Sequence, residues 1–516
     1  MKTKFSLDDD SVVAIVGSGA GGGTLARELS AAGINVVGFE AGGHVAVEQD
    51  PPAMYKRVRW SDTRLHEGDL NPDLPVFIAK AVGGTSIIWA GIALRLQAHE
   101  FQARTTYGDV AGTSLADWPV DAATMAPWYD RAEQRMGVTG RHGNPFLPDH
   151  NNALLLKVGA KRIGFTDVSN GHVAVNASAH DGRPACRQFG FCASGCVIGA
   201  KWSAMHAEIP LALASGRYEL REHSMVVGIE HDTAGHASAV VYVDAEGRRQ
   251  RQRARVVCVA ANGIETPRLL LLSASGKFPT GLANGSGLVG HNYMTDLLGR
   301  VIAIMPGRVD NYRGTSSGGA LVADDMRNDP SRGFVGGYLL APRGIHLSTY
   351  VNEPDPAGWG QDYAEIMEAY PNMATSALLG EDMPVHDNRV ALHSDTLDQY
   401  GNPVPVIHKR FHANDHALMK YGLARGEEIY RALGAERVFT RPSTVAIHNL
   451  GTCRMSADPA TGVCDAFGRS HEVPNLYISD GSQFVSSGAA PPTLTIVALA
   501  LRQAAAIVQD LRSGQL

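Results

Sequence analysis

Cysteine is scarce in this chain, with six residues in 516. That density lies far below that of small secreted domains built on disulfides, so a disulfide framework is excluded as the basis of the fold. An excess of one charge is also lacking, because 46 Lys and Arg stand against 52 Asp and Glu, for a net charge of −6. No basic block interleaved with aromatic residues occurs either, so we expect no nucleic-acid partner.

Long apolar runs are missing too. The best candidate, TLTIVALALRQAAAIV (493–508), is short for a membrane span and contains Arg502, so we expect a packed helix and no direct membrane span. The N-terminus lacks an apolar stretch and a twin arginine, so we expect no signal peptide of its own. A composition of 44% hydrophobic and 19% charged residues suits a globular protein of two or three domains, or one large elaborated domain.

The segment SVVAIVGSGAGGGTLARELSAAGINVVGFEAG (11–42) predicts a β-α-β unit. Its apolar run from Val12 to Val16 predicts a strand, the pattern from Thr24 to Ala32 a helix, and the next apolar run a strand that ends at Glu40. Glycines fill the turn between the first strand and the helix with the spacing G-x-G-x-x-G. Strand, turn, helix and terminal acid together are typical of a dinucleotide-binding site.

Each glycine of that turn has an expected task. Gly17 permits the tight turn, Gly19 lets the backbone approach a pyrophosphate, and Gly22 lets the helix pack on the strand. The phosphates would lie at the helix N-terminus, where free N–H groups and the helix dipole favour anions. Glu40 is placed to bind a ribose hydroxyl, which indicates FAD or NAD and not NADP. This segment alone does not distinguish FAD from NAD.

Four later segments follow in a recognisable order: KAVGGTSIIWAGIALR (80–95), VVCVAANGIETPRLLLLSAS (256–275), HNLGTCRMSADP (448–459) and NLYISDGSQFVSSGAAPPTLTIVALALRQAAAIV (475–508). With these segments the chain resembles the glucose–methanol–choline (GMC) oxidoreductase family of FAD enzymes, over most of its length. The resemblance implies an α/β fold, with a Rossmann-like FAD-binding domain and an α+β substrate-binding domain carrying an antiparallel sheet. The FAD-binding domain would comprise 1–100, 185–300 and 440–516, and the substrate-binding domain 101–184 and 301–439.

The resemblance also assigns residues to the flavin. The first glycine turn and Glu40 would hold the ADP half, and Val226 would contact adenine through its main chain. Asp480 and Gly481 would face the ribityl and pyrophosphate groups, and the helix start at Thr493 the flavin N1/O2 edge, where a helix N-terminus stabilises negative charge. The full set of expected cofactor residues is Gly17, Gly19, Ala20, Gly22, Glu40, Ala41, Gly84, Thr85, Ala90, Gly91, Val226, Asp480, Gly481 and Thr493.

The resemblance makes His448, which opens the family motif HNLGTCRM, the expected catalytic base. Histidine suits this role, since alcohol oxidation by a flavin needs a group of near-neutral pKa to take the hydroxyl proton. Relatives place a second His or Asn where this chain has Pro491, which has no side-chain donor or acceptor. Either Asn449 supplies the missing contact, or His448 acts largely alone, or the activity is lost or altered. Some relatives bind FAD covalently through a histidine at the position of Ile88, so we expect non-covalent FAD here.

Three cysteines lie together in CRQFGFCASGC: Cys186, Cys192 and Cys196. A zinc site would need a fourth ligand, for which His172, His180 and His223 are candidates. The alternatives are an iron–sulfur cluster and plain structural cysteines. The segment is similar to that of bacterial FAD-dependent glucose and fructose dehydrogenases, and this implies a [3Fe–4S] cluster. Cys258 is expected in a strand, and Cys453 and Cys464 in structural roles.

The leading hypothesis is therefore an FAD-dependent dehydrogenase that acts on a CH–OH group of a sugar, glycoside or polyol. An oxidase of the same fold that makes H₂O₂ without a cluster, and a flavin-bound lyase or non-redox subunit, remain alternatives. By resemblance, the partners would be a small export-chaperone subunit and a cytochrome electron acceptor. We expect a periplasmic location by co-export with that subunit, or a cytoplasmic one.

Overall fold

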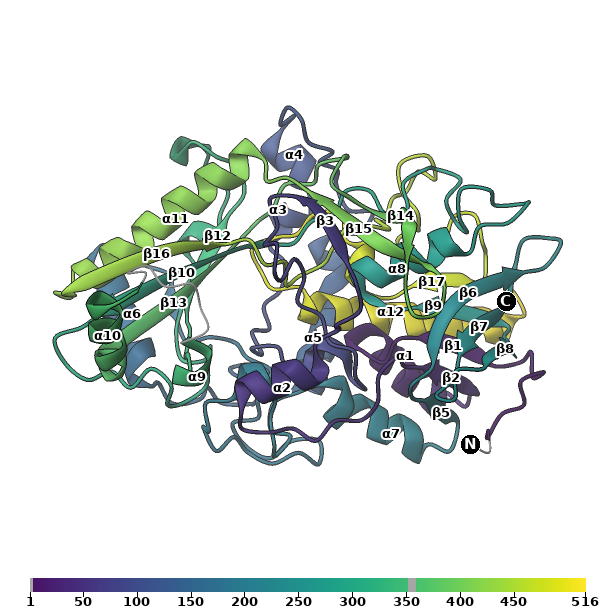
Figure 1. Cartoon of the computed structure of the whole chain (residues 1–516), viewed down its shortest axis with the longest axis horizontal. Helices are drawn as coiled ribbons and strands as arrows, with labels where there is room; N and C mark the ends of the chain where they lie inside the picture. The colour runs from purple at the N-terminus through teal and green to yellow at the C-terminus, as the bar shows by residue number, and fades with distance from the viewer. Residues whose placement is uncertain (1–2, 351–358) are drawn as a thin grey trace.

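The computed structural model describes residues 3–350 and 359–516, and a parallel five-stranded sheet forms the half of the molecule that carries both termini (Figure 1). Its strand order is β17-β9-β1-β2-β5, and every neighbouring pair runs parallel. The residues of β1, β2, β9 and β17 are all buried, as expected for apolar strands covered on both faces. The strands are β1 (Val13–Val16), β2 (Val36–Phe39), β5 (Tyr218–Arg221), β9 (Val256–Val259) and β17 (Leu476–Ile478).

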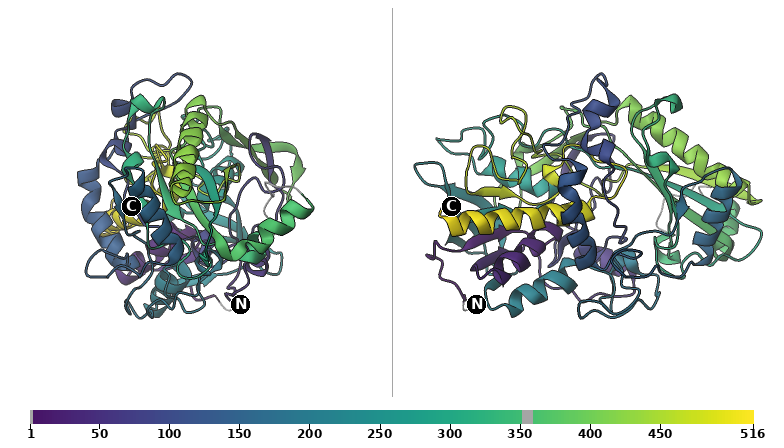
Figure 2. Two further views of the ribbon diagram at one scale, coloured as in Figure 1. Left: turned by 90° about the vertical axis from the view of Figure 1, so that its left-hand side faces the viewer. Right: turned by 180° about the vertical axis from the view of Figure 1, so that it is seen from behind.

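Helices α1 (Ala20–Ala31) and α12 (Thr493–Ser513) lie side by side against one face of this sheet, as the right-hand view of Figure 2 shows. Because side chains alternate along a strand, Val13 and Ile15 of β1 pack in the same apolar cluster as Ala500 and Ala504 of α12. Helix α5 (Ala122–Met136) packs on α12, where the hydroxyls of Tyr129 and Thr495 lie 2.8 Å apart.

The other face of the parallel sheet is covered by an antiparallel sheet of order β6-β7-β8. Val16 and Phe39 belong to the same apolar cluster as Tyr242, and the rings of Phe39 and Tyr242 are 4.9 Å apart. Helix α8 (Asn262–Leu272) packs against β6. The three strands are β6 (Met225–His231), β7 (Ala237–Val243) and β8 (Arg249–Arg253).

A six-stranded sheet of order β16-β10-β13-β12-β11-β4 forms the second half of the molecule. All its pairs are antiparallel, and α6 (Asn151–Arg162) and α11 (Ala413–Arg431) pack on it. Leu418 and Leu423 of α11 share an apolar cluster with Val301 and Leu378 of the sheet. The strands are β4 (Val168–Ser169), β10 (Leu297–Ile304), β11 (Leu321–Val322), β12 (Tyr338–Pro342), β13 (Met373–Gly380) and β16 (Arg437–Ser443).

A second three-stranded sheet, β14-β15-β3, joins the two halves. Its strand β3 (Leu65–Gly68) comes from the expected FAD-binding segments, whereas β14 (Arg389–Leu397) and β15 (Pro403–Lys409) come from the expected substrate-binding segments. The division into two domains stays a prediction, and its residues 351–358 lie outside the described part. The remaining helices are α2 (Pro51–Val58), α3 (Ala98–Phe101), α4 (Ala103–Tyr107), α7 (Ile209–Ala214), α9 (Leu347–Tyr350) and α10 (Gln361–Glu368).

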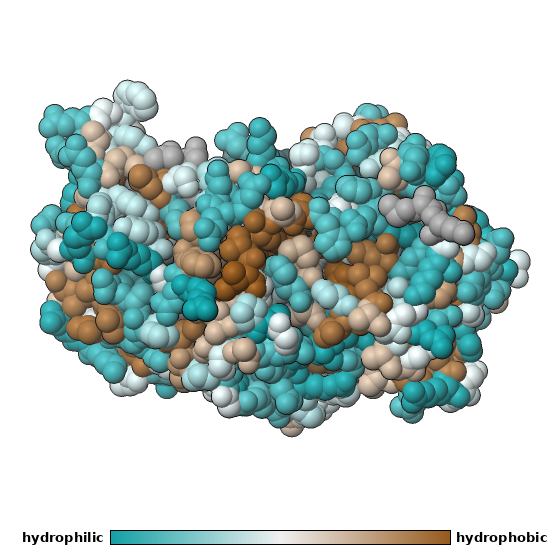
Figure 3. Space-filling view, turned by 90° about the horizontal axis from the view of Figure 1, so that it is seen from below, coloured by the Kyte–Doolittle hydropathy of each residue, from teal (hydrophilic) through white to brown (hydrophobic). Residues whose placement is uncertain are grey.

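The expected fold class is confirmed, with small differences at element boundaries. The first strand begins at Val13, and α1 begins at Ala20 instead of Thr24, so three glycines of the turn segment belong to the helix. Helix α12 is the one helix among the described residues that is long and apolar enough to cross a membrane. Most of it is buried within the protein, as expected for a packed helix. The face in Figure 3 is largely hydrophilic, with apolar residues near its middle.

Replacing Gly21 by alanine tests how closely α1 approaches the parallel sheet. A Cβ on Gly21 would lie 1.6 Å from the carbonyl oxygen of Ser479, which follows β17, so backbone would have to move. Overpacking of this kind costs about 3 kcal/mol of unfolding free energy. Gly307 is exposed with open space around it, so G307A should change that free energy by less than about 0.5 kcal/mol. Denaturant unfolding measures both, and equal values would contradict the close packing.

Candidate active site

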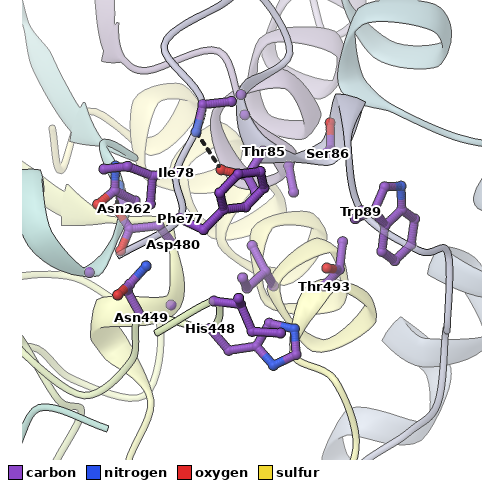
Figure 4. Close-up of a pocket in the computed structure, with 18 of the residues that line it drawn as sticks. Phe77, Ile78, Thr85, Ser86, Trp89, Asn262, His448, Asn449, Asp480 and Thr493 are labelled. Carbon is purple, nitrogen blue, oxygen red and sulfur yellow. Dashed lines mark hydrogen bonds between the residues drawn. The ribbon is translucent and has the colours of Figure 1, made fainter. Parts of the chain in front are cut away.

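A cavity of about 330 Å³ lies at the carboxyl ends of β1, β9 and β17, where ligands bind in open α/β sheets (Figure 4). Its lining includes Leu298 and Ala377 from the six-stranded sheet, so both halves of the molecule contribute. All the expected cofactor and catalytic residues line it except Gly22. Those that do are Gly17, Gly19, Ala20, Glu40, Ala41, Gly84, Thr85, Ala90, Gly91, Val226, His448, Asn449, Asp480, Gly481 and Thr493.

His448 is held by a buried carboxylate that the sequence did not indicate. Its Nδ1–H donates to Oδ2 of Asp296 over 2.9 Å, and the Asp296 side chain is 2% exposed. Burial raises the pKa of Asp296 to about 6, against the opposing effect of the His448 hydrogen bond. Because Nδ1 is occupied, Nε2 is the ring nitrogen left for a ligand. Asp296 lies 152 residues before His448 and has a left-handed backbone (φ 46°), so only the fold brings the pair together.

Asn449 and Pro491 both line the cavity near this pair. The buried hydroxyl of Tyr293 donates to Oδ1 of Asn449 over 2.6 Å. This bond fixes the amide plane and leaves the NH₂ group of Asn449 as its remaining donor. The part that Asn449 plays in place of a residue at 491 stays a prediction.

The N-terminus of α12 opens on the same cavity, through Pro491, Pro492 and Thr493. Within the described part of the chain, no side chain caps this end of the 21-residue helix, so its first N–H groups can face a ligand. The positive end of the helix dipole therefore points at the space beside His448, and Figure 4 shows Thr493 and His448 as neighbours.

Asp480 lines the cavity but binds mainly to protein. Its Oδ2 accepts hydrogen bonds from the Asn262 N–H and the Thr266 hydroxyl, at 2.9 and 2.5 Å. Its Oδ1 accepts two more from the N–H and hydroxyl of Ser482, at 2.8 and 2.6 Å. Asp480 thereby ties the start of α8 to the end of β17, and its expected contact with the ribityl and pyrophosphate groups stays a prediction.

The three clustered cysteines lie beside the cavity, which Ala193 of their loop lines directly. All three are free thiols and partly exposed. Among the described residues they do not form a group with ligand atoms within 4.8 Å of one another, although thiolates around one zinc ion would lie about 4 Å apart. Two of the candidate fourth ligands each donate one ring N–H to a backbone carbonyl, His172 to that of Thr139 and His180 to that of Gln134, which leaves the other ring nitrogen of each available. This arrangement does not favour a single zinc ion.

The other three cysteines are also free and are buried. Cys258 lies in β9, as expected. Cys464 and Cys453 are not bonded to each other as a disulfide; the Cys464 thiol donates to the Cys453 carbonyl.

Two family profiles match the chain, one over residues 9–297 and one over 384–500, and both describe GMC oxidoreductases. The chain belongs to the GMC oxidoreductase family. It is 32% identical to 2-methyl-1,2-propanediol dehydrogenase of Mycolicibacterium austroafricanum, over 96% of this chain and 94% of that protein. It is 27% identical to the fructose dehydrogenase large subunit of Gluconobacter japonicus, over 97% and 98%. An FAD-dependent oxidoreductase from Chaetomium thermophilum shares the fold, with a TM-score of 0.69, 16% identity and coverage of 98% and 100%.

Members of this family use FAD, so the chain is an FAD-dependent oxidoreductase, and the first glycine turn fits the cofactor. A Cβ on Gly17 would lie 2.3 Å from the Ala260 carbonyl oxygen, and one on Gly22 would lie 2.0 Å from the Gly17 oxygen, so both are needed for packing. A Cβ on Gly19 would meet no atom of the described residues closer than 4.0 Å, and its φ of −71° suits any residue. The protein therefore leaves the space beside Gly19 for a ligand.

Glu40, the expected ribose contact in this GMC oxidoreductase, lines the cavity and is held there by three hydrogen bonds. Its Oε2 accepts hydrogen bonds from the N–H and hydroxyl of Ser18, and its Oε1 accepts one from the Gly42 N–H over 2.9 Å. The Ser18 hydroxyl oxygen in turn accepts the Gly83 N–H over 3.0 Å. Burial raises the pKa of Glu40, and these bonds oppose that rise. Ser18, which the G-x-G-x-x-G pattern leaves unspecified, thus connects the two glycine turns.

Alanine at Gly19 should separate folding from cofactor binding. We expect G19A to keep its unfolding free energy without cofactor within about 0.5 kcal/mol of wild type, because the protein leaves room for the methyl group. The methyl group would occupy the pyrophosphate site, so FAD content after gel filtration should fall at least tenfold. Full FAD retention would show that the space beside Gly19 does not hold the pyrophosphate.

Removing the Asp296 carboxylate should weaken the base. The wild-type rate of flavin reduction should fall as pH drops through about 6, since Asp296 becomes neutral there and no longer attracts a charged His448. D296N should lower that rate by about two orders of magnitude and lose this inflection. The matched control is D149N, because Asp149 forms an ion pair with Lys157 outside the cavity lining. D149N should keep the wild-type rate of flavin reduction and its inflection near pH 6. Anaerobic stopped-flow traces across pH measure them, and an unchanged D296N profile would contradict the pairing.

Proposed function

We propose that this GMC oxidoreductase oxidises the CH–OH group of a sugar, glycoside or polyol and passes the electrons through a [3Fe–4S] cluster to an external acceptor. The observation that carries the proposal is the His448–Asp296 pair, whose histidine lines the same cavity as the expected dinucleotide-binding segments. When bound, FAD supplies the acceptor for the hydride that leaves the substrate carbon.

The protein's own residues would handle the proton. Nε2 of His448 takes the hydroxyl proton, and the Asp296 carboxylate, which accepts Nδ1–H, stabilises the positive charge that develops on the ring. The Asn449 amide and the N-terminus of α12 supply donors beside the reacting oxygen and the flavin edge. Each alcohol loses one proton and one hydride and becomes a carbonyl, so two electrons and two protons must leave the site per turnover.

The wall that faces the dinucleotide segments supports a polyhydroxy substrate. The apolar part of this wall comes from Leu298, Ala377 and Leu379. Arg300 and Arg343 add charged groups to the same lining. Convergent polar groups on an apolar wall suit the hydroxyls and the carbon skeleton of a sugar or polyol. The names of the two curated relatives, which specify a diol and fructose, agree with this substrate class.

Backbone hydrogen bonds to two of the cysteine sulfurs support the proposal of a cluster in the cysteine loop. The Gln188 N–H donates to Sγ of Cys186 over 3.3 Å, and the Lys201 N–H donates to Sγ of Cys196 over 3.4 Å. Hydrogen bonds of this kind stabilise metal-bound thiolates. Cys192 immediately precedes Ala193 of the cavity lining, so a cluster there would lie next to the flavin site.

The electrons would then pass to a cytochrome, and a small partner subunit would carry the chain to the periplasm; a cytoplasmic location is the alternative. The support for a partner is the relative described as a large subunit.

Iron analysis and anaerobic bleaching of the flavin test the proposal together. The purified holoenzyme should hold about three iron atoms per FAD and give a [3Fe–4S] EPR signal. Within a panel of sugars, glycosides and polyols, at least one should bleach the flavin, and H448A should slow that reaction by about 10²- to 10⁴-fold at unchanged FAD content. Iron-free protein whose reduced flavin reoxidises rapidly in air would indicate the oxidase instead. Stoichiometric FAD that no alcohol bleaches would indicate the lyase or non-redox subunit.

Single cysteine variants localise the cluster. C192A should lose the iron and the EPR signal and still have its flavin reduced by substrate, because hydride transfer precedes electron exit. C258A, at a buried cysteine in β9, is the control and should keep its iron. Iron retained in C192A would show that the cluster is not bound by Cys192.

A further inference from the structure

Lys201 is a fully buried lysine that bridges the cysteine loop and the wall of the flavin cavity. Its Nζ donates hydrogen bonds to the carbonyl oxygens of Cys192, Trp89 and Ile87, at 2.6, 2.7 and 2.8 Å. Three acceptors require three N–H donors, so the side chain is the charged ammonium. The Lys201 ammonium therefore contacts both the cysteine loop and the segment that carries Ile87 and the cavity-lining Trp89.

The charge of this ammonium lacks a carboxylate partner. Within residues 3–350 and 359–516, the groups close to Lys201 that could carry the opposite charge are the sulfurs of Cys192 and Cys196. Buried lysines are usually paired with an acid, because an unpaired buried charge is costly. Lys409 shows the usual arrangement, with its ammonium 2.6 Å from the Asp382 carboxylate. The arrangement at Lys201 makes sense if the sulfurs beside it carry negative charge, as metal-bound thiolates do.

The residues next to Lys201 Nζ strengthen the same connection. The backbone N–H of Lys201 donates to Sγ of Cys196. The following residue, Trp202, accepts the indole N–H of Trp89 at its carbonyl oxygen over 2.8 Å, and the two indole rings pack edge to face. Residues 201 and 202 thus fix both the cavity-lining Trp89 and the cysteine loop, so these two parts cannot move independently without breaking several buried hydrogen bonds.

We propose that Lys201 is a positioning residue for electron exit: its ammonium fixes the cysteine loop against the flavin-binding wall and raises the reduction potential of the cluster. The inference rests on the cluster of the proposed function. A positive charge beside a cluster favours the form that has gained an electron, so it raises the potential. The same contacts keep the distance between the two redox groups constant through turnover.

The test compares wild type with K201M and K201Q as holoenzymes. Both variants remove the charge, and K201Q keeps an amide that can donate two hydrogen bonds. We expect FAD content, iron content and substrate-driven flavin reduction to stay within about twofold of wild type. The EPR-monitored potential of the cluster should shift to lower values, and cluster reduction after flavin reduction should slow at least tenfold in anaerobic stopped flow. The rate should fall further in K201M than in K201Q, since K201M also loses the bridging donors.

K157M is the control, because Lys157 is a partly buried lysine paired with Asp149, outside the cavity lining and the cysteine loop. It should leave the potential and the transfer rate unchanged. An iron-free wild type would overturn the proposed function. Iron-containing wild type with unchanged potential and transfer rate in the Lys201 variants would overturn only the role of Lys201. If K201M does not fold, K201Q decides by the same two readouts.

Discussion

The close approach of backbone to backbone at the carboxyl ends of β1, β9 and β17 is the constraint on which the rest of the site depends. Gly17 and Gly21 touch the carbonyl groups of Ala260 and Ser479 so closely that neither position has room for a Cβ. This contact brings the N-terminus of α1 over the edge of the sheet, and the packing of α12 along α1 brings a second helix N-terminus to the same cavity. Both positive helix ends then face this cavity, where they would stabilise a cofactor that is an anion at its pyrophosphate and becomes more negative at its flavin when reduced.

Buried charges around the cavity follow one rule, which is that each has several fixed partners. Glu40 accepts three hydrogen bonds, Asp480 accepts four, and Lys201 donates three through its ammonium. Such networks connect segments that are distant in the sequence. Because a buried polar group that loses its partners is costly in free energy, the networks keep those segments in place. Asp296 is the exception, since one of its oxygens binds His448 and the other has no hydrogen-bond partner among the residues that the structure describes. A carboxylate with one unpaired oxygen is less stabilised by other groups, so it can respond more strongly to the positive charge that develops on His448.

The dinucleotide-binding segment 11–42 could be predicted from the sequence because its residues are close together in the chain. A strand, a glycine turn, a helix and an acid at the next strand end lie within about 30 residues of one another, so their spacing alone predicts a dinucleotide site. The same holds for the β9–α8 and β17–α12 units, whose strands and helices lie where their apolar runs indicated. Gly21 was missed because the pattern names only three positions, whereas the tight contact comes from Ser479, more than 450 residues away.

The sequence by itself determined the fold class, the FAD cofactor and the family, since these depend on local periodicity and on short motifs whose physical tasks are fixed. Only the tertiary structure decided that Asp296 orients His448, that Tyr293 fixes Asn449, and that Lys201 joins the cysteine loop to the cavity wall. No spacing rule connects these pairs, because their distances arise from how two sheets and their loops pack against each other. Burial then changes the chemistry of the residues it encloses, as the raised pKa of Asp296 shows, and burial is a property of the packed chain.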